Sequence, residues 1–303
     1  MNISTDVLQL RNRSVCIYKK KVSHKVNEDD KILSDWKKEF SSETNNKINN
    51  INKSAYSGNV TVHAQRRIRK ACNILTQISS NQVIYNPITK KMFDFKLTFI
   101  TLTIPDKVEV SEEKKLYNDL LKPLLKHLQQ VYNMSSYIWK AEYQKRGVIH
   151  YHITTNVFIP YDKLRLKWNK LIYKNGLMKG YIKKYKSTNP NSTDIHKVYN
   201  DNSIEIYLEK YISKIDKENR SINGKVWDCS LNLKKAKLFT VELSPKHLTN
   251  ITNKINSTVV KSFKHEYFQL YYFNEPIIHN ILNGYEHLMY QQWQKVIIDG
   301  VRS

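Results

Sequence analysis

Two histidines separated by one residue, His150 and His152, are the first feature of the sequence that could do chemistry. They lie in the run VIHYHITT, whose β-branched and aromatic residues predict a β-strand. Side chains at positions i and i+2 of a strand share a face, so both imidazoles can reach one ion. An isolated pair fits a solvated strand face just as simply, and that alternative is the commoner one.

A carboxylate, Glu142, precedes the histidines in the run SYIWKAEY, a second predicted strand. A turn at Arg146 and Gly147 separates the two strands, so strand pairing would bring Glu142 across from the histidines. Two neutral imidazoles and one carboxylate leave positions open on a divalent cation, as polarisation of a phosphate oxygen requires. Mixed nitrogen and oxygen ligands suit Mn²⁺ and tolerate Mg²⁺, so either ion is the expected cofactor.

A run at 204–214, IEIYLEKYISK, supplies a possible nucleophile. Tyr207 and Tyr211 are four residues apart, as are Lys210 and Lys214, so each pair shares a face of a predicted helix. A phenol has a pKa of about 10 and attacks poorly at neutral pH. A nearby ammonium group and a metal-polarised phosphate would make its attack feasible.

The tyrosine spacing alone is a weak signal. The chain holds 20 tyrosines, and the same spacing occurs at Tyr181 and Tyr185 and at Tyr267 and Tyr271. Such a pair is ordinarily core packing, but only 204–214 repeats the tyrosine-x-x-lysine unit.

The elements that must position these groups are short strands joined by tight turns, with helices between them. This order predicts an α+β fold with a central antiparallel sheet flanked by helices, because βαβ winding would need fewer strands. Pro123 should kink its helix or mark the helix's true start. The expected strands lie within 82–105, 136–160, 194–198, 226–233, 238–244 and 263–273, the expected helices at 59–80, 111–132, 162–173 and 203–215, and a Lys/Ser/Asn loop at 183–194.

The charge balance points to a polyanionic partner. The formal net charge is +23, from 50 Lys and Arg against 27 Asp and Glu. Nucleic acid is the default partner, because no stretch approaches the roughly 18 apolar residues of a membrane span. Three dispersed cysteines indicate a reducing compartment, so we expect a cytoplasmic protein. Two basic clusters could contact DNA or be solvated: Arg66, Arg67, Arg69 and Lys70, and Lys183, Lys184 and Lys186.

These groups, in this order, resemble the HUH endonucleases, a superfamily named for its histidine–hydrophobe–histidine motif. The resemblance is to the two-tyrosine replication initiators of small single-stranded DNA phages and related plasmids. The run FITLT at 99–103 matches the family's FLTLT-type strand, WKAEYQKRGVIHYH matches its metal motif with the upstream acid, and YLEKYISK matches its tyrosine helix. Tyr151 stands where an aliphatic residue is usual, and we expect it on the opposite face of the strand.

The resemblance implies a protein that starts rolling-circle replication by nicking and rejoining single-stranded DNA at an origin. Glu142, His150 and His152 would hold Mg²⁺ or Mn²⁺, with no small-molecule cofactor. One tyrosine would form a 5′-phosphotyrosyl link, the other would cut the regenerated origin, and Lys210 and Lys214 would stabilise the phenolate or contact phosphate. A host polymerase is an implied partner, and so is a host helicase because the sequence lacks a GxxxxGK[ST] loop.

Composition, periodicity and the resemblance together predict a division of the chain, and alternatives to the predicted function stay open. We expect a polar, partly disordered arm at 1–58, a basic amphipathic helix at 59–82, an HUH endonuclease domain at 83–275 and a helical tail at 276–303. A two-tyrosine single-strand DNA transposase shares this motif order, whereas a conjugative relaxase usually places its tyrosine first. A non-catalytic, RRM-like module that binds single-stranded nucleic acid is the alternative from another class.

Overall fold

The sheet that carries the two histidines is built from five antiparallel strands. A computed structural model describes residues 4–21, 60–86, 90–198, 221–265, 268–274, 276 and 278–300 of the chain. In spatial order, the strands of this histidine sheet are β8 (Thr193–Val198), β5 (Leu97–Thr103), β7 (Ile149–Thr155), β6 (Tyr137–Tyr143) and β9 (Trp227–Cys229). The predicted α+β class, with its central antiparallel sheet, is confirmed.

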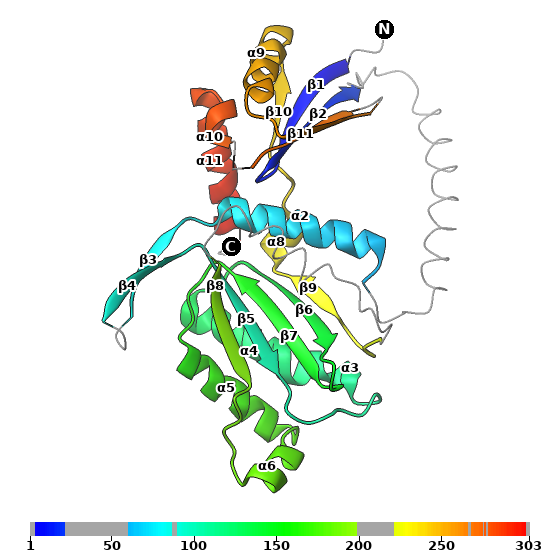
Figure 1. Cartoon of the computed structure of the whole chain (residues 1–303), viewed down its shortest axis with the longest axis vertical. Coiled ribbons are helices and arrows are strands. Elements are labelled where there is room, and N and C mark those ends of the chain that lie inside the picture. Colours follow the sequence, from blue (N-terminus) through cyan, green and yellow to red (C-terminus); the bar gives the residue numbers. More distant parts are fainter. Residues whose placement is uncertain are drawn as a thin grey trace, which may run out of the picture.

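One face of the histidine sheet packs against helices. Tyr151 of β7 meets Trp139 of β6 edge to face, with ring centroids 6.0 Å apart, and meets Trp168 of α5 (Tyr161–Lys174) at 6.2 Å. The buried Trp168 indole N–H donates a hydrogen bond to the Thr103 carbonyl oxygen, 3.0 Å away. Figure 1 shows α5 and α4 (Lys122–Tyr132) on this side of the sheet. Because alternate side chains point to opposite faces, His150 and His152 face away from these helices.

The helix predicted at 111–132 is present but contains a π-helical turn just before Pro123. It comprises α3 (Glu113–Leu116), a π-helical turn η1 (Tyr117–Leu121) and α4. Pro123 lies in the first turn of α4, where its missing N–H is tolerated. The Asp119 carbonyl four residues earlier instead accepts a hydrogen bond from the Asn175 side chain at 3.4 Å.

A second five-stranded sheet, the terminal sheet, joins the two ends of the chain. Its order is β10 (Thr240–Leu243), β1 (Ser4–Leu10), β2 (Ser14–Lys21), β12 (Phe268–Tyr272) and β11 (Lys261–Lys264). The helices α9 (Pro245–Asn256), α10 (Ile278–Ile281) and α11 (Gly284–Asp299) contribute Ile251, Ile255, Ile281 and Tyr290 to its core. Figure 1 shows the two large sheets on opposite sides of α2 (Val62–Ile78), with the small hairpin of β3 (Gln82–Asn86) and β4 (Lys91–Phe95) extending beside it.

Three sequence-based expectations differ from this structure. The arm predicted at 1–58 is wrong for residues 4–21, because the apolar side chains of Leu8, Leu10, Val15 and Ile17 are buried in the terminal sheet. Residues 231–235, predicted as strand, form helix α8 (Leu231–Lys235) after the strand ends at Cys229. The loop expected from residue 183 begins later, after α6 (Lys179–Tyr185).

The helices expected at 59–80 and 162–173 are confirmed as α2 and α5, whereas the helix expected at 203–215 lies outside the described residues. Helix α2 begins after Thr61, whose hydroxyl accepts a hydrogen bond from the Ala64 N–H at 3.1 Å, and it buries Ile68, Leu75 and Ile78. Helices α10 and α11 lie in the segment expected to be helical. No helix in the described part of the chain has the length and apolar character to cross a membrane.

Candidate functional site

The β6–β7 hairpin brings Glu142 and the two histidines to one face of the sheet. The hairpin turns at Gly147, whose φ of 81° favours glycine, and the Gly147 N–H donates to the Gln144 carbonyl at 2.8 Å. The resulting register pairs Glu142 with His150 and Lys140 with His152. The register therefore places Glu142, His150 and His152 on one face of the β6–β7 hairpin, and their role as metal ligands stays a prediction.

Hydrogen bonds fix the His152 ring on both sides. Its Nε2 atom lies 2.9 Å from Oε1 of Glu142, and its Nδ1 atom lies 3.1 Å from the Thr101 hydroxyl oxygen. The Phe99 ring stacks on the imidazole, with centroids 5.3 Å apart. His152 is only 6% exposed. A ring held in this way cannot change rotamer without losing these contacts, so the site is built around one orientation of His152.

His150 is held less tightly. Its Nε2 atom lies 3.4 Å from the Thr103 hydroxyl oxygen, and its ring centroid lies 6.2 Å from that of His152. Burial, together with the neighbouring His152, lowers the pKa of His150 to about 4. The imidazole is therefore neutral near pH 7, and the neutral form is the one that binds metal ions.

A buried lysine, Lys140, completes this cluster and was not anticipated from the sequence. Its side chain is almost fully buried, and its Nζ atom lies 3.7 Å from Oε2 of Glu142. The available signal was the alternation in WKAEY, which places residues 140 and 142 on one face of a strand. The ammonium group places a positive charge beside the carboxylate, where an anionic substrate would be attracted.

The edge strand β8 adds a second imidazole–carboxylate pair to the same face. Asp194 pairs with Thr101 in the strand register, and His196 pairs with Phe99. The His196 Nε2 atom lies 2.6 Å from Oδ2 of Asp194, and both side chains are more than half exposed. These residues were also missed, although DIH has the same i, i+2 alternation as HYH.

The donor types at Glu142, His150 and His152 suit a divalent cation with open coordination positions. The Glu142 carboxylate already contacts the His152 imidazole nitrogen, and a metal ion would take the place of the proton between them. In the described ranges of the chain, no three His, Cys, Asp or Glu side chains are gathered closely enough to hold an ion. The ligand set therefore stays a prediction.

The predicted nucleophiles Tyr207 and Tyr211 and their neighbours Lys210 and Lys214 lie outside the described residues. A different tyrosine pair with the same spacing is described in α6, where the ring centroids of Tyr181 and Tyr185 lie 4.7 Å apart.

The two basic clusters lie on different helices. On α2, Arg66, Arg69 and Lys70 line one cavity, whereas the Arg67 guanidinium lies over the Trp227 ring of β9, 5.4 Å from its centroid. Lys183 and Lys184 are exposed on α6, and Lys186 follows that helix in the left-handed conformation with φ of 53°. The predicted DNA-binding residues are therefore divided between α2 and the region of α6, and their contact with DNA stays a prediction.

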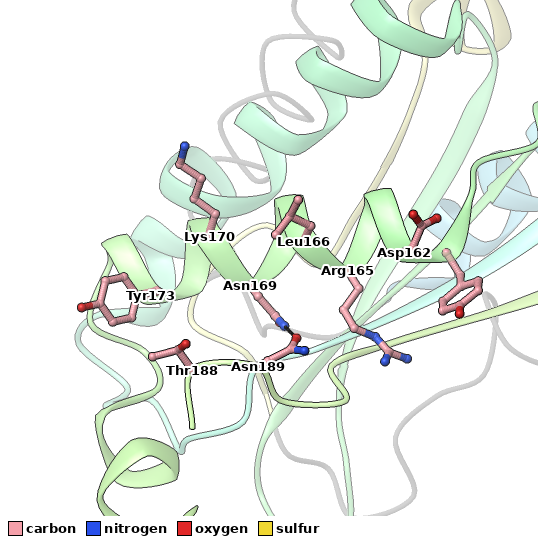
Figure 2. A pocket seen from close by; sticks show the side chains of 9 residues that line it. Asp162, Arg165, Leu166, Asn169, Lys170, Tyr173, Thr188 and Asn189 are labelled. Atoms are coloured by element: carbon pink, nitrogen blue, oxygen red, sulfur yellow. Dashed lines mark hydrogen bonds between the residues drawn. The ribbon is translucent and has the colours of Figure 1, made fainter. Parts of the chain in front are cut away.

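A groove beside α5 is lined by aromatic and polar side chains. Figure 2 shows Asn169 hydrogen-bonded to Asn189, with an Nδ2–Oδ1 distance of 2.8 Å. Arg165 donates to Asn191 at 2.7 Å and lies over the Tyr161 ring. The volume of this groove is about 850 Å³. Because these polar groups bond to one another, they hold the 188–192 loop against α5.

Comparison with known families matches residues 97–216 to the ORF2 family of replication-associated proteins. The matched segment begins with β5 and includes both histidines, Glu142 and the 204–214 run. No curated protein and no solved structure matches the chain. The match agrees with the resemblance to rolling-circle replication initiators and supports a role in starting replication.

Proposed function

We propose that this protein starts rolling-circle DNA replication by nicking single-stranded DNA at an origin and later rejoining it. The observation that carries the proposal is the strand register that sets Glu142 opposite His150, with His152 on the same face. The match of residues 97–216 to replication-associated proteins supports the same role.

In this proposal, Glu142, His150 and His152 hold Mg²⁺ or Mn²⁺, which polarises the scissile phosphate when bound. The hydroxyl groups of Thr101 and Thr103 orient the two imidazoles. The Lys140 ammonium group, beside Glu142, adds positive charge close to the phosphate.

The proposed nucleophile is the phenolic oxygen of Tyr207 or Tyr211. This oxygen bonds to phosphorus while the P–O3′ bond breaks, so the phenol loses a proton and the departing 3′ oxygen gains one. The products are a 5′-phosphotyrosyl link and a 3′-hydroxyl group that primes a host polymerase. After one circuit the second tyrosine cuts the regenerated origin, and the released 3′-hydroxyl attacks the first phosphotyrosine to close a circle. Lys210 and Lys214 stabilise the phenolate or contact phosphate, and a host helicase separates the strands.

The test is incubation of the protein with labelled circular single-stranded DNA and Mn²⁺, followed by denaturing gels. Wild type should form a covalent adduct that EDTA abolishes, each of Tyr207→Phe and Tyr211→Phe should retain some adduct, and the double variant should form none. Tyr181→Phe/Tyr185→Phe is the matched control and should behave as wild type. Adduct formation by the 207/211 double variant at the wild-type level would refute the assignment of the nucleophiles.

Variants of the two histidines distinguish the proposed enzyme from a non-catalytic module that only binds single strands. Substitution of both His150 and His152 by alanine should abolish cleavage and leave single-strand binding intact. Loss of binding in this variant, with no cleavage by wild type, would favour the binding module.

A further inference from the structure

A cationic cleft lies where the terminal sheet meets helix α2, separate from the residues of the histidine site. Its volume is about 630 Å³. Five of the lining residues carry positive charge and none carries negative charge: Arg11, Arg13, Arg66, Arg69 and Lys70. Ser14, Asn73, Leu238 and Tyr272 complete the lining.

The helix side of the cleft follows from the spacing of residues on α2. Arg66, Arg69, Lys70 and Asn73 stand at positions i, i+3, i+4 and i+7, which share one face of a helix. Arg67 is off this face and lies over Trp227. Helix α2 therefore divides the sequence cluster RRIRK into residues that face the cleft and one that packs on β9.

The sheet side of the cleft is the tight turn between β1 and β2. The Arg11 N–H donates to the Ser14 carbonyl at 2.9 Å, which closes the turn. The backbone N–H of Asn12, at the tip of the turn, donates to Oδ1 of Asn73 on α2 at 2.9 Å. This contact ties the turn to the helix, so cations more than 50 residues apart in the sequence line one cavity.

One donor group among the lining residues has no partner in the described part of the chain. The Nε atom of Arg11 is buried and has no hydrogen-bond partner among the described residues. Buried donors of this kind are costly unless an acceptor reaches them. The groove of Figure 2 differs, because Arg165 and Asn169 there bond to neighbouring side chains.

We propose that this cleft is a second nucleic-acid site, which binds the phosphate backbone of DNA outside the histidine site. Phosphate oxygens are acceptors only and carry negative charge, so they complement a lining of cations that includes the unsatisfied Nε donor of Arg11. Only one aromatic side chain, Tyr272, lines the cleft, so the contact is to the backbone and is independent of base sequence. The proposal that DNA binds in this cleft does not depend on whether the protein nicks DNA.

The test compares DNA binding by two variants, Arg66→Gln/Arg69→Gln and Lys122→Gln/Lys126→Gln. Each removes two charges from exposed helical positions, but only the first pair lines the cleft. Binding of a short labelled single strand is followed by fluorescence anisotropy across a salt series. Loss of two phosphate contacts should lower the slope of log K against log salt by about 1.4, at about 0.7 for each contact, and should weaken binding to unrelated sequences equally.

Two further measurements separate the possible outcomes. Arg11→Gln/Arg13→Gln should reproduce the loss from the sheet side, and thermal melting checks that each variant is folded. Cleavage of the same oligonucleotide by wild type, at a saturating concentration of protein, tests the nicking proposal by itself, so failure of nicking is distinguished from failure of binding at the cleft. Equal slopes for the cleft and control variants would overturn the proposal. DNA binding by wild type that does not change when millimolar inorganic phosphate is added would overturn it as well.

Discussion

The Nε2 atom of His152 lies 2.9 Å from the carboxylate of Glu142, although the strand register pairs Glu142 with His150. The contact is therefore diagonal across the β6–β7 hairpin, a geometry within reach of long side chains. With Thr101 on the other side of the ring and Lys140 behind the carboxylate, it forms a polar chain that crosses β5, β7 and β6. This chain fixes the direction in which His152 presents its nitrogen atoms.

Glu142→Gln should abolish metal-dependent cleavage. The substitution keeps the size of the side chain but removes the charge, so the imidazole pair loses its only partner carboxylate on β6. We expect a loss of at least about 100-fold, because outer-shell changes at metal sites already cost about 10–100-fold. Cleavage of labelled single strands at a fixed Mn²⁺ concentration measures the loss of activity, and titration with Mn²⁺ measures the affinity of the protein for the metal ion.

The control for this change is Glu112→Gln. Glu112 is an exposed residue whose carboxylate pairs with Lys115 and not with a residue of the histidine cluster, so its loss should leave cleavage unchanged. Glu142→Gln also leaves the Lys140 ammonium group without that carboxylate, and thermal melting separates a folding defect from a catalytic one. A folded Glu142→Gln protein that cleaves at the wild-type rate would remove Glu142 from the ligand set.

Thr101→Val should weaken metal-dependent cleavage without unfolding the protein. The change deletes the hydroxyl group 3.1 Å from Nδ1 of His152 while it keeps the β-branched shape that suits a strand. The expected loss in activity or in Mn²⁺ affinity is about 10–100-fold, as for other groups that orient a ligand imidazole. If Mn²⁺ affinity and cleavage are both unaffected, the hydroxyl does not orient the ring.

Thr154→Val is predicted to stabilise the fold. Thr154 lies on β7 on the same face as the histidines, is fully buried, and its hydroxyl oxygen has no hydrogen-bond partner in the described ranges. Replacing an unsatisfied hydroxyl by a methyl group removes a desolvation cost of about 1–3 kcal/mol. Chemical denaturation should show a higher free energy of unfolding with cleavage unchanged, which also makes this variant the matched control for Thr101→Val. A lower free energy of unfolding would mean that the hydroxyl has an acceptor.

The histidine sheet could be predicted from the sequence because its information is local. Gly147 and the alternation on either side of it set the β6–β7 register, and this register alone brings Glu142 to the histidines. Pro123 marked the start of α4 for an equally local reason, its missing N–H. Lys140 was missed because a lysine in a strand is normally solvated, and its burial depends on neighbours from other strands.

The terminal sheet and the cationic cleft could not be predicted in the same way. β1 pairs with β10, more than 200 residues later in the chain, and no local pattern records such a pairing. The short apolar runs of β1 and β2 are adjacent to a long Lys/Asn-rich segment, whose composition dominated the interpretation. Arg11 and Arg13 therefore gave no signal as partners of Arg66 and Arg69.

Leu8→Ala tests whether residues 4–21 are an integral part of the fold. Leu8 is fully buried on β1, a strand paired on one side with β2 and on the other with β10. Truncation of a buried leucine to alanine leaves a cavity and costs about 2–5 kcal/mol. Gln9→Ala, on the neighbouring position of the same strand, removes a side chain that is only partly buried and should cost far less. Denaturant titration followed by circular dichroism compares the two free energies of unfolding. If residues 4–21 were a loosely ordered arm, both variants would have the same free energy of unfolding as wild type, because an arm contributes no buried surface to the fold.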